Sequence, residues 1–555
     1  MQRVITAAGM REIDRLTTER FATPSLLLME SAAAASARAI AARLPDGLQG
    51  KRVRILCGRG NNGGDGAALA RALWLAGART DVVLFGRVKE TKGDARANFE
   101  ITERLSSFEA GSHTQPPPLS FTECETIADW EEIAAHSYDI IVDALFGTGL
   151  TRPLEGVHRQ VVEHVALLRR ARERAGTSQP LIVSLDIPSG LNADSATLTG
   201  EALQADLTVT FTAPKTANVL PPASHYNGEL VVANIGSPPA LLEAAETKLF
   251  LTEEGDAREW LVKTRYAPDS YKNTHGHALI IAGSRGMTGA AVLCGKAAMR
   301  AGAGLVTIAT AASAQPAVAA RAIPEIMTAT LPETTQGAIS FEAIEQVMKI
   351  ALRANVAAIG PGLSNEDEGT RRFVREVVER RTIPLVIDAD GLNALAPWPE
   401  DLRGSNEFPL ILTPHPGEML RLMGTDETEA LADRVQAARD FATAHNVIIV
   451  LKGTRTLIAS PDGRVFVNPT GNAGLGTAGA GDTLTGIITG FIAQAVGTLK
   501  DDMDALSATI AAVYVGGLAG DIAAALRGMR TLVASDISES LSAAVCALDA
   551  EGEQP

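Results

Sequence analysis

Short, continuous runs of apolar residues alternate with stretches of helical periodicity through the first 235 residues. The runs are rich in Val, Ile and Leu and cover residues 53–57, 81–85, 139–142, 181–185, 207–211 and 229–233. Continuous apolar runs are typical of strands buried on both faces of a parallel sheet. Helical stretches such as residues 66–76 and 157–175 lie between them. This alternation predicts a doubly wound α/β sheet.

The alternation stops after Ile235 and starts again near residue 278. The intervening segment, residues 237–249, contains two prolines, and we expect it to be a linker. Further strands are predicted over residues 278–282, 305–309, 356–359, 385–387, 410–412, 447–451, 456–459 and 464–467, the last two joined by a turn. The sequence therefore predicts two tandem α/β domains, residues 1–236 and 250–555. We expect residues 106–122, with three consecutive prolines, to form an exposed loop.

The charge balance of the 555 residues changes the range of possible partners. There are 50 Lys and Arg against 65 Asp and Glu, a formal net charge of −15. Neutralising a phosphate backbone needs a basic face, so we expect no nucleic acid partner. Nothing in the sequence is typical of a membrane span or a signal peptide, and the four cysteines are too far apart to predict a disulfide framework. We expect a cytoplasmic protein with no membrane partner.

A glycine-rich loop, GRGNNGGDG from Gly58 to Gly66, follows the first predicted strand. Glycines permit positive φ and close backbone approach, and a helix N-terminus attracts an anion. The loop therefore predicts a phosphate-binding turn at the carboxyl end of a strand. The alternative is a tight turn with Asn and Asp as helix caps.

Two more predicted strands end in an aspartate. Asp143 precedes a Gly-Thr-Gly turn, and Asp186 precedes Pro-Ser-Gly. The carboxyl ends of parallel strands face one crevice, where Asn62, Asp143 and Ser189 could offer oxygen ligands to a monovalent cation. Asp65 and Asp186 could meet a polar substrate there. A single strand-end Asp is usually a helix cap, but three such sites at one edge favour a pocket.

The second half carries its own candidate chemistry. The segment from Gly479 to Asp482, Gly-Ala-Gly-Asp, precedes an apolar helix and could hold a phosphoryl group on its backbone N–H groups. Asp482 would then be the base that removes a proton from an acceptor hydroxyl, or else only a helix cap. His415 lies between two prolines at a strand end, which favours ligand contact, and Lys452 could reach phosphates.

Three motifs of the first half, GRGNNGGDG, VDALFGTGL and SLDIPSG, together resemble the YjeF N-terminal domain, an NAD(P)H-hydrate epimerase. The resemblance covers roughly residues 1–236. It implies a Rossmann-like fold that interconverts the R and S forms of hydrated NADH and NADPH. It also implies potassium ligands at Asn62, Asp143 and Ser189, with Asp186 as the acid–base group. The implied substrate contacts are Asn61, Asn62, Gly63, Gly64, Asp65, Gly147, Thr148, Gly149, Leu150, Thr151, Arg152, Pro153 and Asp186.

Five motifs of the second half, GSRGMTGAA, GPGL, HPGE, KGT and GAGD, resemble the YjeF C-terminal domain. That family is a nucleotide-dependent (S)-NAD(P)H-hydrate dehydratase of ribokinase-like fold, and the resemblance covers roughly residues 250–550. The implied hydrate contacts are Ala290, Gly362, His415 and Asp482. The implied nucleotide site consists of Lys452, Gly453, Thr454, Arg455, Thr456 and Gly481. Many bacterial members have GGTGD where this chain has Ala480, and we expect activity to persist because the backbone N–H groups remain.

The two resemblances together imply one bifunctional repair enzyme for damaged nicotinamide cofactors. The first domain would interconvert the epimers. In the second domain Asp482 would deprotonate the ring hydroxyl, a nucleotide would phosphorylate it, and phosphate would leave to restore NAD(P)H. We expect ADP as the co-substrate, magnesium with the nucleotide, and a homo-oligomer. Two alternatives stay open: a small-molecule kinase that keeps the phosphate on its product, and a first half that binds without catalysis.

Overall fold

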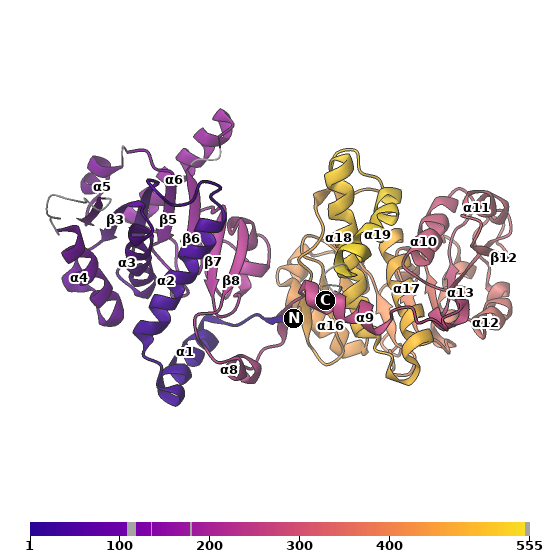
Figure 1. The fold of residues 1–555 in the computed structure, drawn as a ribbon. Helices are drawn as coiled ribbons and strands as arrows, with labels where there is room; N and C mark the ends of the chain where they lie inside the picture. The colour runs from indigo at the N-terminus through magenta and orange to yellow at the C-terminus, as the bar shows by residue number, and fades with distance from the viewer. Residues whose placement is uncertain (108–117, 135, 178–179, 550–555) are drawn as a thin grey trace. The chain divides into compact units, whose positions relative to one another are not determined.

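The computed structural model describes residues 1–107, 118–134, 136–177 and 180–549. The chain divides into two compact units, Gln2–Thr247 and Lys248–Pro555, with Met1 assigned to the second (Figure 1). Each unit is built on a largely parallel sheet flanked by helices, which confirms the predicted α/β class. The predicted linker, residues 237–249, contains helix α8 (Pro239–Ala244) and the point of division.

The sheet of the first unit has the order β4-β3-β2-β5-β6-β7-β8, and every neighbouring pair is parallel. Its strands are β2 (Arg52–Cys57), β3 (Arg79–Phe85), β4 (Leu119–Cys124), β5 (Ile140–Ala144), β6 (Leu181–Leu185), β7 (Leu207–Phe211) and β8 (Glu229–Ala233). A short strand, β1, spans Gln2–Arg3. The helices besides α8 are α1 (Ala7–Phe21), α2 (Ser25–Ala42), α3 (Asn61–Leu75), α4 (Gly93–Ser106), α5 (Ile127–Ile133), α6 (Gly156–Ala175) and α7 (Thr216–Val219).

Both faces of this sheet are covered. Ile55 of β2 belongs to a core shared with helices α2, α3 and α4, whereas the next residue, Leu56, belongs to a core shared with α5 and α6. Successive side chains of a strand point to opposite faces, so each residue of a central strand enters one core or the other. This explains why the central strands read as continuous apolar runs.

The prediction of an exposed loop over residues 106–122 is wrong for residues 119–122. Residues 108–117 lie outside the described part, but β4 occupies Leu119–Cys124 and pairs with β3 at the edge of the sheet. Ser120 is exposed, and Phe121 and Thr122 are only partly buried. An edge strand has a neighbour on one side only, so it does not need the apolar run that marks a central strand. Strand β12 (Met327–Leu331), at the edge of the other sheet, was not predicted, for the same reason.

In the second unit the strands follow the order β9-β18-β17-β16-β15-β14-β13-β10-β11-β12. The run from β16 to β12 is parallel, and β17 pairs antiparallel with both β16 and β18. The strands besides β12 are β9 (Leu249–Leu251), β10 (His277–Ile281), β11 (Leu305–Ala311), β13 (Val356–Ile359), β14 (Leu385–Ile387), β15 (Leu410–Leu412), β16 (Ile448–Leu451), β17 (Leu457–Ala459) and β18 (Val465–Val467).

Helices α10, α17, α18 and α19 share one large apolar core with this sheet. The helices of the unit are α9 (Glu254–Lys263), α10 (Thr288–Arg300), α11 (Gln315–Arg321), α12 (Ile344–Ala351), α13 (Glu368–Glu379), α14 (Asp390–Ala394), α15 (Pro416–Leu422), α16 (Arg434–His445), α17 (Ala480–Leu499), α18 (Ala505–Arg527) and α19 (Ala534–Asp549). By length and composition alone, α2 and α18 could cross a membrane. The apolar window of α18 is 67% buried, which accounts for its composition by core packing.

The four cysteines differ in exposure. Cys57, Cys124 and Cys294 are buried, and Cys546 of α19 is exposed. All four are free thiols. Burial raises the pKa of Cys57 and Cys294 far above the usual range, so neither thiol is a ready nucleophile.

Candidate active sites

A cavity of about 750 Å³ lies in the first unit, where strands β2, β5 and β6 end. The three motifs singled out in the first half all contribute to its lining. The predicted residues that line it are Asn61, Asn62, Asp65, Gly147, Thr148, Gly149, Leu150, Arg152, Pro153 and Asp186. Gly63, Gly64 and Thr151 are not among the lining residues. The predicted substrate contacts therefore meet in one pocket, apart from these three, and the predicted cation ligands Asp143 and Ser189 are not among its lining residues either.

The glycine-rich loop brings the start of α3 to this cavity. No side chain caps the helix at Gly60, so its first N–H groups remain available for an anion. Gly63 serves packing, because a Cβ there would lie 1.7 Å from the carbonyl oxygen of Gly58. A Cβ on Gly147 would lie 3.3 Å from Asp186 Oδ2 and 3.4 Å from Asn62 Cβ. The absence of a side chain at Gly147 thus leaves space beside Asp186 and Asn62.

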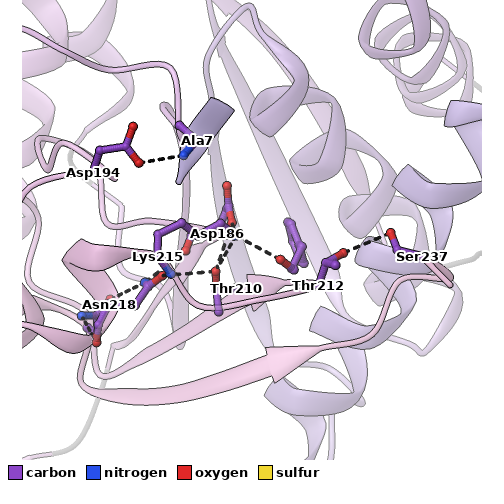
Figure 2. A network of polar contacts seen from close by, with 10 residues as sticks. Ala7, Asp186, Asp194, Thr210, Thr212, Lys215, Asn218 and Ser237 are labelled. Carbon is purple, nitrogen blue, oxygen red and sulfur yellow. Dashed lines mark hydrogen bonds and ion pairs between the residues drawn. The ribbon is translucent and has the colours of Figure 1, made fainter. Parts of the chain in front are cut away.

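Asp186 is held by a buried lysine that the sequence analysis did not identify. Figure 2 shows the Nζ of Lys215 beside Asp186 and Thr210. Lys215 Nζ donates to Asp186 Oδ1 at 2.5 Å, to Thr210 Oγ1 at 2.9 Å and to the carbonyl of Phe211 at 3.0 Å. Asp186 itself has a φ of 64°, a left-handed conformation that is unusual for a residue with a side chain. Lys215 thus fixes one carboxylate oxygen of Asp186, while Oδ2 points to the Gly147 side of the cavity.

Two further carboxyl groups line the same cavity. Burial raises the pKa of Asp14, in helix α1, to about 6, with Asp186 adding to the shift and Lys215 opposing it. Burial also raises the pKa of Asp65 well above its usual range, and the charges of Asp186 and Asp14 add to it. The site therefore holds carboxyl groups with different proton affinities in one small volume, an arrangement typical of acid–base catalysis.

Two of the three predicted cation ligands, Asp143 and Ser189, are joined by hydrogen bonds, and the third, Asn62, lines the cavity. The fully buried Asp143 accepts hydrogen bonds from Ser189 Oγ at 2.5 Å, Ser189 N at 2.8 Å and Ser184 Oγ at 2.9 Å. Asn62 is 8% exposed, and neither polar atom of its side chain has a hydrogen-bond partner in the described residues. A buried amide oxygen without a partner is of the ligand type that a weakly charged cation accepts. Among the described residues no cluster of three or more His, Cys, Asp or Glu could hold a metal.

Lys215 and Asp14 are the residues that the sequence analysis missed in this unit. Lys215 carries a detectable signal, since it follows the buried strand β7 by four residues and so lies at the same sheet edge. Asp14 carries no such signal. It lies within an amphipathic helix in which any acid is most simply read as solvent-exposed.

In the second unit, a buried ion pair stands next to the Gly-Ala-Gly-Asp segment. Lys452 Nζ donates to Asp388 Oδ1 at 2.7 Å, and Thr485 Oγ1 donates to Asp388 Oδ2 at 2.7 Å. A Cβ on Gly481 would lie 3.2 Å from Lys452 Nζ. The structure therefore brings Lys452 to the start of α17, although it lies 29 positions before Gly481 in the sequence.

Asp482 lies in the first turn of α17, whose N-terminus no side chain caps. Burial raises the pKa of Asp482 to about 6, the charges of Asp388, Asp390 and Glu418 add to the shift, and Lys452 opposes it. Burial would lower the pKa of Lys452, but Asp388 and Glu418 raise it overall. The helix start thus combines a fixed cation with a carboxylate poised near neutral pH, the two groups that phosphoryl transfer to a hydroxyl requires.

His415 caps the short helix α15. Its Nδ1 accepts from Gly417 N at 3.0 Å, and Glu418 Oε2 accepts from His415 N at 2.7 Å. The His415 side chain is 50% exposed, and Nε2 lies 3.6 Å from Glu418 Oε1. Glu418 Oε2 also lies 3.8 Å from Lys452 Nζ. The HPGE segment therefore connects with the Asp388–Lys452 pair through Glu418.

Two other predicted hydrate contacts adjoin each other. A Cβ on Gly362 would lie 3.0 Å from the Cβ of Ala290. The φ of Gly362 is 62°, which favours glycine there. A separate cavity of about 630 Å³ beside α15, lined by residues including Asn393 and Arg421, contains none of the predicted site residues.

An arginine organises the predicted nucleotide loop, Lys452–Thr456. Arg434 donates to the carbonyls of Lys452 at 3.2 Å and Thr454 at 3.2 Å. Gly453 has a φ of 140°, and a Cβ there would lie 2.9 Å from Arg434 Nη2. Within the loop, Thr456 Oγ1 donates to the carbonyl of Gly453 at 3.2 Å. Arg455 is directed to the carbonyl of Pro469, at 2.8 Å.

Three supporting residues of the second site, Asp388, Glu418 and Arg434, were not assigned from the sequence. Glu418 lies within the HPGE motif, so its position was marked even though its role was not. Asp388 directly follows the buried strand β14, which is the same strand-end signal that identified Asp143 and Asp186. Arg434 lies 18 residues before Lys452, at the start of α16, and only the folded chain shows which carbonyls it reaches.

Two family models match the chain in the order that the motifs predict. Residues 25–217 match the YjeF-related protein N-terminus, and residues 278–543 match NAD(P)H-hydrate dehydratase. A solved structure of an ADP/ATP-dependent NAD(P)H-hydrate dehydratase from Bacillus subtilis is 32% identical. It covers 55% of this chain and 100% of its own, with a TM-score of 0.46.

Curated relatives align with both units at once. The bifunctional NAD(P)H-hydrate repair enzyme Nnr of Moorella thermoacetica is 38% identical over 550 residues, which are 99% of this chain and 98% of the relative. The enzyme of the same name from Escherichia coli K12 is 32% identical over 489 residues, 88% of this chain and 84% of the relative. The alignment runs through both active-site regions and confirms the family indicated by the motifs. The chain belongs to the family of bifunctional NAD(P)H-hydrate repair enzymes.

Proposed function

We propose that this chain repairs hydrated NADH and NADPH by two reactions, one in each unit. Residues 1–236 would interconvert the R and S hydrates, residues 237–249 would link the domains, and residues 250–555 would dehydrate the S form with ADP. The observation that carries the proposal is the end-to-end similarity to bifunctional repair enzymes, with a carboxylate of perturbed pKa in each of the two assembled sites.

Dehydration needs a better leaving group than hydroxide. Asp482 takes the proton of the ring hydroxyl, and the oxygen then attacks the terminal phosphoryl group of the nucleotide. Lys452 and the N–H groups at the start of α17 stabilise the charge on that group, and Asp388 holds Lys452 in place. The ring C–O bond then breaks and inorganic phosphate leaves. Loss of the neighbouring ring proton restores NAD(P)H. ADP becomes AMP in this cycle.

Epimerisation needs proton transfer at the hydrated ring carbon. Asp186, fixed by Lys215 and open toward Gly147 through Oδ2, is suited to move that proton. Asn62, Asp143 and Ser189 would hold potassium, a fit supported by the unpartnered Asn62 amide. When bound, potassium would add positive charge near the hydrate and fix the loops around it. The N-terminus of α3 would receive a phosphate of the dinucleotide.

The nucleotide preference and its metal are finer parts of the proposal. ADP is favoured over ATP by the family resemblance and the bacterial-looking composition. Magnesium would arrive with the nucleotide phosphates, since Mg²⁺ is commonly held by one or two carboxylates together with substrate phosphates. A cytoplasmic location and a homo-oligomeric state stay predictions.

The test is to incubate the full chain with a mixture of R and S hydrates and either ADP or ATP. Both epimers are followed by chromatography, together with free phosphate. We expect the S form to disappear first, the R form to follow it, and one phosphate to be released for each NAD(P)H restored. A stable phosphoester of the substrate would identify a kinase instead. Consumption of S without R would identify a first unit that binds without catalysis.

A further inference from the structure

The cavity of the first unit contains a carboxyl group, Asp14, that has no role in the epimerisation as proposed above. Asp14 lies in α1, whose Met10 and Arg11 also line the cavity. Asp14 Oδ1 is buried and has no hydrogen-bond partner among the residues that the structure describes. A buried carboxyl oxygen without a hydrogen-bond partner costs folding free energy. At the wall of a ligand cavity, it indicates that a ligand group supplies the missing hydrogen bond.

Helix α1 is fixed against the segment that carries Lys215. Ile5 N donates to the carbonyl of Pro214 at 2.9 Å, directly beside Lys215. Ala7 N, at the start of the helix, donates to Asp194 Oδ1 at 2.7 Å (Figure 2). Ile5, Met10 and Ile13 also share an apolar cluster with Ala213. These contacts hold Asp14 in place relative to Lys215 and the Asp186 that it binds.

We propose that Asp14 and Asp186 are the acid and the base of an epimerisation by water exchange, acting on opposite faces of the hydrated ring. This inference deepens the proposed epimerase function and rests on it. The hydroxyl of the hydrate is bonded to the carbon next to the ring nitrogen, so the substrate is a hemiaminal. Inverting that carbon requires its C–O bond to break and a new one to form on the other face.

This epimerisation needs no reactant other than water. Asp14 gives its proton to the hydroxyl oxygen, the C–O bond breaks, and the nitrogen lone pair forms a C=N⁺ bond as water leaves. A second water attacks the opposite face and gives its proton to the Asp186 carboxylate. The lone pair returns to nitrogen, and solvent resets the two carboxyl groups. The reverse epimerisation exchanges their roles.

Charge favours Asp14 over Asp65 as the partner of Asp186. Lys215 acts on Asp14 as well as binding Asp186, so moving a proton from one to the other leaves the net charge around Lys215 unchanged. The pKa of Asp14, about 6 because of burial, lets this group both hold and release a proton near neutral pH. Burial raises the pKa of Asp65 well above its usual range, the charges of Asp186 and Asp14 add to this shift, and Lys215 is not among the groups that act on it.

The first test is made on the unaltered full chain in ¹⁸O-water. Purified R hydrate is converted briefly, and the newly formed S hydrate is analysed by mass spectrometry against an enzyme-free control. We expect one solvent oxygen in each newly formed S molecule. Retention of the original oxygen would mean ring opening through an aldehyde and would overturn the inference, while the proposed epimerase function would survive. No inversion above the control would instead count against the proposed function.

The second test assigns the acid. Asp14→Asn should lower the rate of epimerisation by roughly 10²–10⁴-fold and leave dehydration of pure S hydrate unchanged. The matched control is Glu19→Gln, an exposed carboxylate of the same helix, which should keep the wild-type rate. In Asp14→Ala, formate enters the vacated space and should restore part of the rate. A normal rate in Asp14→Asn, a larger loss in Asp65→Asn, or no rescue by formate would overturn the assignment.

Discussion

Lys452 Nζ lies 2.7 Å from Asp388 Oδ1, and the two residues directly follow strands β16 and β14 of the same sheet. Asp388 is only 1% exposed, and its pKa, which burial alone would raise, is lowered by Lys452. The ammonium group of Lys452 also faces the start of α17, close to Gly481. The pair therefore links the stability of this end of the strands to the position of the ammonium group that is proposed to stabilise the transferred phosphoryl group.

Removing both members of the pair should cost less than the sum of the two single removals. Asp388→Asn or Lys452→Met leaves an uncompensated buried charge, for which we expect about 3–5 kcal/mol of local destabilisation. The double variant should cost less than the sum, with a coupling of about 0.5–3 kcal/mol. Hydrogen exchange of the peptides containing β14 and α17, in the full chain, measures these effects. Strictly additive losses would show that the two groups do not interact.

Asp482→Asn keeps the side-chain shape and removes the base. We expect dehydration to fall by roughly 10²–10⁴-fold while epimerisation is unchanged, because the two sites lie in different units. Initial rates of phosphate release and epimer exchange provide the two measurements. Asp501→Asn, an exposed acid just after α17, is the matched control. Near-normal dehydration in Asp482→Asn would remove Asp482 from the mechanism.

The raised pKa of Asp482 predicts an acid limb in the dehydration rate. The base must be ionised, so kcat/KM for the hydrate should be level above pH 6 and fall about tenfold per pH unit below it. Lys452 lowers the pKa of Asp482, so Lys452→Met should move the inflection to higher pH as well as weaken nucleotide binding. A pH–rate profile of each protein decides this. An inflection that stays in place would mean that another group titrates.

Asp143 predicts a dependence on potassium. Asp143→Ala should impair epimerisation and abolish its response to potassium, while dehydration of pure S hydrate continues. Rates of epimer exchange against potassium concentration, in the wild type and the variant, provide the measurement, with lithium as the control ion for ionic strength. If Asp143 only supports the loop through its bonds to Ser184 and Ser189, the variant should lose stability and keep its potassium response.

The two units should work when separated. Each contains its own sheet and cores, so fragments 1–247 and 248–555 should each be soluble. The first should retain epimerisation and the second dehydration, as measured by the same two assays. Insolubility of both fragments, or recovery of activity only on mixing, would contradict independent domains.

The sequence predicts the central strands better than the edges because burial on two faces leaves a continuous apolar run. Strands β4 and β12 lack that run, and both were missed for this reason. Strand-end chemistry was predictable in the same way: Asp143 and Asp186 follow apolar runs directly. Asp14 and Arg434 could not be found, because only the fold brings each of them to its site from a distant part of the sequence.

The dehydratase site shows the same limit. The KGT and GAGD motifs were identified separately, yet nothing in the spacing of Lys452 and Gly481 shows that they touch. The pairing depends on the sheet order, in which β16 lies next to β15 and then β14. Local motifs therefore predict which residues carry chemistry, and the topology decides which of them act together.

The uneven burial of the four thiols makes the natural chain a ready subject for site-specific labelling. Cys57, Cys124 and Cys294 are shielded from a maleimide reagent, whereas Cys546 is exposed on α19. A fluorophore or spin label should therefore attach at a single position without any cysteine being replaced. Because α19 shares its apolar core with α17, such a label can test whether a nucleotide moves the helix that carries Asp482.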